Sequence, residues 1–343
     1  MNSLSRKKGG LKAAWNDSPL LSTGLILLLM VVLQTLALGF NFASVGEWFT
    51  AWFSNWVTLL RNNAIVGMIA LGMTFVIITG GIDLAVGSTL VGVGTVVLVT
   101  QEALFNALGM SAGAGVLAIV LSILAGMAAG SGVGLLTGLT VTKGRVPPFI
   151  VTLGAMNIIR SVAQHFMQGR QAPKVVEAFK QISNLQIGAF RPLPILFWVL
   201  MAVILYVVSR HTAFGRHVYA VGSNERTTRL SGINVDRVKI GVYTLMGLIV
   251  SIAAITESAR MGSMNTANAG SGYELDAIAA VVVGGTSMAG GKGSIAGSVM
   301  GMLIIGVMNN LLNLMGVPVF LRNAFKGLIV VVAVLLQRKQ KEN

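Results

Sequence analysis

Residues 276–294 read DAIAAVVVGGTSMAGGKGS, an apolar run followed by a glycine-rich segment with one lysine. Such a stretch is either a phosphate-binding loop or a break between two membrane helices. A nucleotide P-loop needs the spacing G-x-x-x-x-G-K-[ST] after a strand. Here Thr286 stands where the first glycine should be, and Gly293 follows Lys292. The P-loop fails in spacing, and the apolar run before it is typical of a membrane span. We therefore expect a break between two spans, no ATP hydrolysis by this chain and no catalytic residues.

The composition extends this interpretation to the whole chain. Of its 343 residues 54% are hydrophobic and only 10% are charged, whereas soluble domains carry about 25% charged residues. A membrane helix needs about 20 mostly apolar residues. The sequence predicts an all-α, polytopic membrane protein with about ten transmembrane helices, near 19–40, 62–80, 84–100, 114–141, 147–168, 192–210, 240–259, 273–289, 294–315 and 320–337.

The charge and the rare residue types exclude several classes of function. The net charge is +14, and in a membrane protein basic loops set the topology and face anionic lipid, so we expect no nucleic-acid partner. The chain has no cysteine, and its three histidines form no metal-binding motif. We therefore expect no metal and no cofactor. The first apolar run is too long for a signal peptide and is predicted to be a span.

The basic residues also predict the orientation. Most of the 25 lysines and arginines fall on the side of the N-terminus, which places both termini in the cytoplasm. The predicted domains are a basic cytoplasmic tail (1–18), a transmembrane domain (19–337) and a cytoplasmic tail (338–343). Within the transmembrane domain, Trp48, Trp52 and Trp56 recur every four residues in 43–60. This spacing predicts a separate helix in the membrane interface.

Glycines take two roles in this sequence. Stripes at every fourth position, such as Gly126 to Gly138 and Gly293 to Gly301, are expected to let helices approach closely. Others are expected to break helices between spans: Gly80, Gly81, Gly284, Gly285, Gly290 and Gly291.

Few polar side chains fall at membrane depth. Asp83 in the stretch GGIDLAVGS (80–88) could cap the following helix or line a polar path. Asn157 and Arg160 share a helix face, because they are three residues apart, and Asp276 opens a later span. We expect Asp83, Asn157, Arg160 and Asp276 to line a translocation path. Glu257 and Arg260 are expected to form an interfacial ion pair worth less than about 1 kcal/mol.

The segment 209–239 is the longest predicted cytoplasmic loop. It contains a short predicted helix, Glu225 to Leu230, with Asn224 as its N-cap and Gly232 as its stop. Such a helix is either a docking element for a cytosolic partner or part of a basic loop that only sets the topology.

Four stretches carry a resemblance to a known family: GGIDLAVGS (80–88), KGRVPPFIVTLGAMNIIR (143–160), GRHVYAVGSNERTTRLSGINV (215–235) and GYELDAIAAVVVGGTSMAGGKGS (272–294). Together they resemble the permease subunits of bacterial monosaccharide ABC importers, the ribose, xylose, arabinose and galactose class. The C-terminal half looks most similar to ribose permeases.

The resemblance implies a protein of the bacterial plasma (inner) membrane that carries ribose or a similar pentose or hexose. Family members also carry furanosyl autoinducers and nucleosides. The implied partners are a cytosolic ABC ATPase, an extracytoplasmic sugar-binding protein, membrane lipid and a second permease copy or a homologous permease. The implied ATPase-coupling residues are Asn224, Glu225, Arg229, Leu230 and Gly232.

Two other classes of membrane protein are alternatives to an importer permease. An ion-coupled secondary sugar carrier would use Asp83 and Arg160. An intramembrane enzyme would need a nucleophile and base at helical spacing, which the sequence does not offer.

Overall fold

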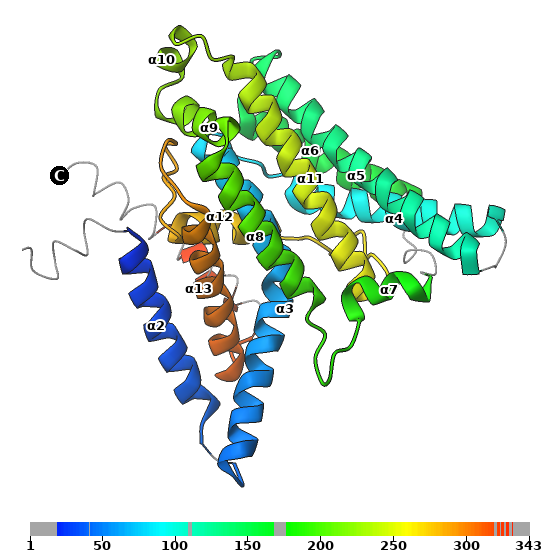
Figure 1. Ribbon diagram of the computed structural model, residues 1–343, viewed down its shortest axis with the longest axis vertical. Helices are drawn as coiled ribbons and strands as arrows, with labels where there is room; N and C mark the ends of the chain where they lie inside the picture. The colour runs from blue at the N-terminus through cyan, green and yellow to red at the C-terminus, as the bar shows by residue number, and fades with distance from the viewer. Residues whose placement is uncertain are drawn as a thin grey trace, which may run out of the picture.

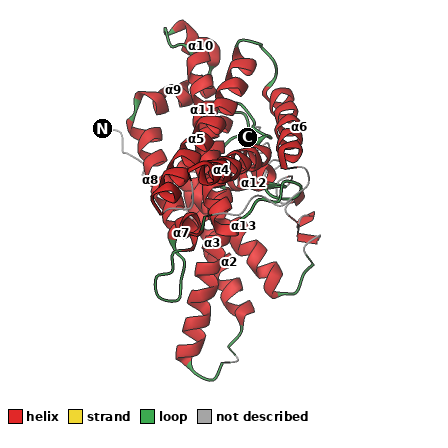
Figure 2. Cartoon of the chain, turned by 90° about the vertical axis from the view of Figure 1, so that its right-hand side faces the viewer, coloured by secondary structure: helices red, strands yellow, loops and turns green. Residues whose placement is uncertain are grey.

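The computed structural model describes residues 19–40, 42–108, 112–167 and 176–318, together with 321–322, 324–325, 327–328 and 331. In these residues the ordered elements are helices (Figures 1 and 2), and the β pairing is limited to one isolated bridge, Ile187 to Phe190. The helices are α2 (Pro19–Leu38), α3 (Val45–Ile78), α4 (Val86–Leu108), α5 (Ala112–Thr142), α6 (Pro148–Met167), α7 (Glu177–Asn184), α8 (Leu193–His211), α9 (Ala213–Ser223), α10 (Glu225–Leu230), α11 (Val235–Met261), α12 (Tyr273–Val283) and α13 (Ile295–Leu314).

The all-helical membrane architecture is confirmed in its coarse form. Six of the helices are long and apolar enough to cross a membrane: α3, α4, α5, α8, α11 and α13. The predicted number of ten spans is not confirmed by these six. The predicted span 320–337 lies largely outside the described residues, and the tails 1–18 and 338–343 lie entirely outside them.

The separate helix predicted for 43–60 is wrong in its boundary, because these residues form the first half of α3. Ser44 caps α3 by accepting a hydrogen bond from the Glu47 backbone N–H, and no proline interrupts the next 34 residues. At 1.5 Å per residue α3 is about 51 Å long, well above the ~30 Å of a bilayer core. Its tryptophans pack inward on α2: Trp52 Nε1 donates to Thr35 Oγ1 at 3.1 Å, and Trp48 stacks on Phe40.

The glycine stripes pack helices of the same chain together, as predicted. α5 crosses α11 so closely that a Cβ on Gly134 would overlap the Tyr243 carbonyl oxygen, and Gly247 of α11 lies against the Gly130 backbone. Gly297 of α13 lies in the same way against Gly284. Because these faces are filled within the chain, they are not free to join two copies.

The span predicted at 273–289 is also wrong in length. α12 ends at Val283, and Gly285 then adopts a left-handed conformation with φ 89°. With 11 residues, α12 measures about 16 Å, roughly half of a membrane. Non-helical backbone at membrane depth is tolerated only where protein or a cavity surrounds it. The ends of α12 therefore mark positions inside the helix bundle.

Candidate functional site

Two non-helical connections meet the last turn of α9 at the end of the molecule that carries α9 and α10, which we call the α10 end (upper part of Figure 1). The Gly291 N–H donates to the Ile78 carbonyl at 2.9 Å and so ties the loop after α12 to the last turn of α3. Gly222 of α9 packs onto both groups, and Gly290 lies against the Gly222 carbonyl. We call this contact of Ile78, Gly222, Gly290 and Gly291 the glycine junction.

The predicted helix breaks lie in the connections that form this junction. Gly80 and Gly81 follow the end of α3, and Gly284 and Gly285 follow the end of α12. Gly80, Gly290 and Gly291 have φ of 76°, 83° and 74°, a left-handed region that strains any residue with a Cβ. Glycine is needed there for the turn, whereas Gly222 is needed for close approach.

Tyr219 adds a side-chain link between α9 and the same loop. Its hydroxyl donates to the Gly293 carbonyl at 3.0 Å. Burial raises the pKa of Tyr219 above its ordinary value, so the phenol stays protonated and able to donate. The loop 284–294 is therefore held to α9 by backbone packing and by this hydrogen bond. Sequence reasoning missed Tyr219 and Gly222, because their partners Ile78, Gly291 and Gly293 are about 70 residues or more away along the chain.

α10 begins and ends as the sequence predicts. Asn224 Oδ1 accepts a hydrogen bond from the Thr227 N–H at 2.9 Å, which is the expected N-cap. Gly232 turns the chain with φ 82°. Thr228 is buried and anchors the helix, whereas Leu230 at its last position is 82% exposed. An apolar side chain this exposed at the tip of a short anchored helix fits a docking element for a partner.

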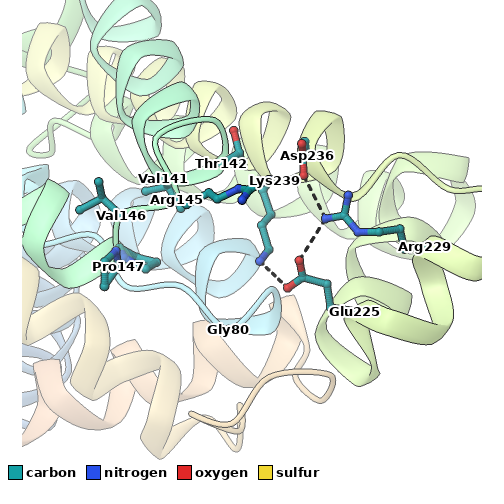
Figure 3. Close-up of a pocket in the computed structure, with 11 residues that line it drawn as sticks. Gly80, Val141, Thr142, Arg145, Val146, Pro147, Glu225, Arg229, Asp236 and Lys239 are labelled. Atoms are coloured by element: carbon teal, nitrogen blue, oxygen red, sulfur yellow. Dashed lines mark hydrogen bonds and ion pairs between the residues drawn. The ribbon is translucent and has the colours of Figure 1, made fainter.

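A chain of ion pairs fixes α10 to α11 (Figure 3), and one further pair links it to Lys143, just after α5. Lys239 contacts Glu225 at 2.7 Å, Arg229 contacts both Glu225 and Asp236, and Lys143 contacts Asp236 at 3.1 Å. The hydrogen bond from Lys239 holds the pKa of Glu225 below its ordinary value, so the network stays charged at neutral pH. Each pair has at least one exposed partner, so a single pair adds little stability; together the pairs orient the helix.

The same side chains line a cavity of about 590 Å³ between α10, α11 and the α5–α6 connection. Gly80 lies at its floor, and Glu225, Arg229, Asp236 and Lys239 lie along one wall. Two of the implied coupling residues, Glu225 and Arg229, thus border the same cavity as Gly80 in the break after α3.

Asp83 lies buried in the extended connection before α4. Its Oδ1 accepts a hydrogen bond from the Ala85 N–H at 2.8 Å, which fixes the turn from which α4 starts at Val86. Tyr243 and Thr152 both reach the neighbouring Ile82 carbonyl at 3.5 Å. Asp83 therefore shapes the turn that precedes α4, and its bond to Ala85 is not a helix cap, because Ala85 lies before the first helical residue.

Asn157 and Arg160 share α6 but have different surroundings. Arg160 donates to the carbonyls of Thr266 and Ala269 at 3.0 and 2.8 Å and so holds the α11–α12 connection. Asn157 is exposed, and its side chain bonds the Leu153 carbonyl of its own helix. The two side chains therefore make different contacts: Arg160 bonds the α11–α12 connection and Asn157 bonds its own helix.

The starts of α4 and α12 meet inside the bundle. Gly87 in the first turn of α4 lies against Gly270, just before α12 begins at Tyr273. Glu274 and Asp276 occupy the first turn of α12, where a carboxylate is stabilised by the helix dipole. Two helix N-termini at membrane depth resemble the broken helices that many transporters place at their substrate path. In the described ranges no three acidic or histidine side chains lie close enough to hold a metal ion.

The pair of Glu257 and Arg260 is not the exposed interfacial pair predicted from the sequence. The Arg260 and Glu257 side chains are only 17% and 7% exposed, and two hydrogen bonds of 2.9 and 3.1 Å join them side by side. Tyr273 and Asn62 bond the outer atoms of the pair. Because the neighbouring helices cover it, breaking this pair would cost about 3–5 kcal/mol rather than less than 1.

The replacement Asp83→Asn tests the role of that carboxylate. An asparagine oxygen can still accept the Ala85 N–H, so we expect uptake of the transported solute to stay within about threefold of the parent, because the hydrogen bond worth about 1 kcal/mol is kept. Asp83→Ala removes the acceptor and should lower the amount of folded protein. Uptake in vesicles is the measurement. A complete loss with Asp83→Asn at normal abundance would show instead that the charge itself is needed.

The sequence was compared with protein families and with known proteins. Residues 55–334 match the family described as "Branched-chain amino acid transport system / permease component". The chain is 40% identical over 323 residues to the ribose import permease protein RbsC of Escherichia coli K12, covering 92% of this chain and 93% of that protein. It is 44% identical over 290 residues to RbsC of Bacillus subtilis 168, covering 83% and 85%.

The xylose transport system permease protein XylH of Escherichia coli K12 is 33% identical over 376 residues, with 92% of each chain covered. No solved structure matches the chain. The resemblance to monosaccharide permeases drawn from the four sequence motifs is thereby confirmed. The bundle of apolar helices, its broken segments and the matches over most of the sequence lead to one conclusion: this multi-pass membrane chain belongs to the transport-system permease family that its residues 55–334 match.

Proposed function

We propose that this chain is the membrane-spanning subunit of an ATP-driven importer of a monosaccharide, ribose or a similar pentose or hexose, in the bacterial inner membrane. The observation that carries the proposal is identity of 40–44% to ribose import permeases over most of the chain. The missing P-loop agrees with it, because a separate ATPase subunit would then supply the energy. The transport role assigns no chemical reaction to this chain.

In this proposal the α10 end faces the cytoplasm and binds the ATPase. The exposed Leu230 and the N-capped α10 support this assignment. The opposite end would receive the sugar from an extracytoplasmic binding protein, and a second permease copy or a homologous permease would complete the path. Both chain termini would then lie in the cytoplasm, as the distribution of basic residues suggests.

The glycine junction gives a physical route for coupling. A movement of α10 is passed to α9, and α9 contacts the ends of both broken helices through Gly222 and Tyr219. Rigid-body shifts of packed helices are a common basis of such transitions. ATP-driven closure of the ATPase pair would therefore move the connections after α3 and α12 together and switch the side on which the path is open.

Two other functions are less well supported. An ion-coupled carrier needs a carboxylate that binds and releases an ion, but Asp83 is engaged in the turn before α4, and the relatives are import permeases. The family description mentions branched-chain amino acids, yet the similar curated proteins named above are ribose and xylose permeases.

Reconstitution tests the proposal. Proteoliposomes containing this chain, a candidate ATPase and a binding protein should take up labelled ribose when ATP is present on the ATPase side. Omission of any one component, or of ATP, should reduce uptake to the level of empty vesicles. Uptake by this chain alone under a proton or sodium gradient would overturn the proposal in favour of the ion-coupled carrier. Labelled xylose and leucine in the same vesicles would compare the substrate classes directly.

A further inference from the structure

A second cavity, of about 430 Å³, lies between α3 and α13 in the half of the molecule away from α10. Seven of its ten lining residues carry a carboxamide or a hydroxyl group, and we call it the asparagine cavity. The lining includes Asn55, Thr58 and Asn62 of α3 and Asn309, Asn310 and Asn313 of α13. Neither the sequence motifs nor the predicted path residues fall in it.

The polar residues of this cavity form one stripe on each helix. Asn55, Thr58 and Asn62 follow the spacing of one face of α3. Asn309 lies 14 residues beyond the start of α13 at Ile295, which is about 21 Å along the helix axis. The stripe therefore sits in the outer half of a bilayer core of ~30 Å. Polar groups at that depth are costly, and they usually face a polar path rather than lipid.

Some of these side chains already have hydrogen-bond partners within the protein, and others keep atoms that are free to bond a ligand. Asn55 and Asn310 bond each other, and Gln34 of α2 donates to Asn310 at 3.0 Å, so this trio ties three helices together. By contrast, Asn309 Oδ1 is buried without a hydrogen-bond partner among the described residues. Thr58 and Asn62 are exposed residues of α3 that line the cavity, although Asn62 Oδ1 already accepts a hydrogen bond from Arg260. A buried oxygen without a partner is destabilising, so Asn309 fits a role in which a ligand or water completes its bonding.

The charge of the cavity limits what it can bind. No carboxylate lines it among the described residues, and Arg322 is its one charged side chain. The nearby Arg260 is neutralised by Glu257 and donates to Asn62 at 3.1 Å. An amino acid would leave its ammonium group without a counter-charge here. A neutral polyhydroxyl compound needs only the donors and acceptors that carboxamides offer. The volume lies within the ~300–1,000 Å³ of small-molecule sites.

We propose that the asparagine cavity is a sugar-contacting surface of the outer half of the translocation path, with Asn309, Thr58 and Asn62 as its contact residues. This inference rests on the proposed function and adds to it the place and the chemistry of substrate contact. It also places that contact away from Asn157, which lies on α6 and donates to the Leu153 carbonyl of the same helix.

The absence of cysteine from the chain makes a direct test possible. Single-cysteine variants Thr58→Cys and Asn309→Cys are reconstituted with the ATPase and the binding protein, and a membrane-impermeant maleimide is added outside. Both positions should react, and saturating ribose with ATP turnover should slow the reaction at both. Asn106→Cys is the matched control: Asn106 is exposed near the end of α4, outside the cavity, and its labelling should not depend on ribose.

A transport measurement complements the labelling. Thr58→Val keeps the shape of the side chain and removes the hydroxyl, and Asn309→Leu removes the carboxamide. Each should raise the KM for ribose about threefold to tenfold, the effect of one lost hydrogen bond, with ATP hydrolysis in the absence of sugar unchanged. Asn106→Leu should leave the KM at the parent value.

The outcomes separate this inference from the proposed function. If the parent chain imports ribose but ribose changes neither labelling nor KM in the cavity variants, the site is wrong and the function stands. If the cavity cysteines do not react and instead cross-link two copies of the chain, the surface is an interface between copies and the inference is overturned. If the parent chain imports no ribose in the presence of both partners, the proposed function itself fails.

Discussion

Replacing Leu230 by aspartate should abolish ATP-driven sugar uptake without unfolding the chain. Leu230 is 82% exposed at the end of α10, whereas its neighbour Thr228 is buried, so the substitution changes a surface and leaves the packing of the bundle intact. If Leu230 enters an apolar recess of the ATPase, aspartate would place a charge there. Loss of a central apolar contact is worth about 2 kcal/mol or more, so uptake should fall at least about thirtyfold.

The measurement compares uptake with the amount of ATPase that co-purifies with the chain. Leu230→Asp should lose both, and the chain should reach the membrane in normal amounts. Leu230→Met keeps an apolar side chain of similar volume, so it should retain most of both. Normal docking and uptake with Leu230→Asp would show that α10 does not bind the ATPase, and the proposed orientation of the molecule would then lose its main structural support.

The sequence predicts the local structure of this chain well. Apolar runs of sufficient length predict α5, α8 and α13 closely, because a membrane helix depends mainly on continuous hydrophobicity. Asn224 is correctly predicted as a cap, since its side chain bonds a backbone group only three residues away. Glycine stripes predict close helix packing, because a residue without a side chain lets any neighbouring helix approach its backbone.

Features that depend on distant partners could not be predicted in this way. The tryptophans of α3 looked like interface anchors because their partners on α2, such as Thr35, precede them across a turn. Glu257 and Arg260 looked exposed because the helices that cover them are far away in the sequence. The asparagine cavity joins residues 55–63 to residues 306–322. A single sequence gives no signal that these two stretches face each other.

Replacing Gly222 by alanine should uncouple ATP hydrolysis from transport. Gly222 has an ordinary negative φ, so the backbone tolerates alanine, but the new Cβ would overlap the Ile78 carbonyl oxygen and approach the Gly291 N–H. Both are backbone groups, which cannot rotate away as a flexible side chain would. The junction must therefore open, and the hydrogen bond from Gly291 to Ile78 is weakened. Overpacking of this kind costs about 1–3 kcal/mol, so uptake should fall about tenfold to a hundredfold.

The ratio of ribose imported to ATP hydrolysed separates uncoupling from misfolding. Gly222→Ala should keep ATPase docking through α10, because Leu230 is untouched, while the ratio falls. Gly154→Ala on α6 is the matched control, since a Cβ there meets no atom within 4 Å; it should behave like the parent. Tyr219→Phe removes only the bond to Gly293 and should lower the ratio in the same direction by a smaller factor. If both junction variants transport with the parent ratio, α9 does not pass movement to the broken helices, and coupling must instead run through the ion pairs between α10 and α11.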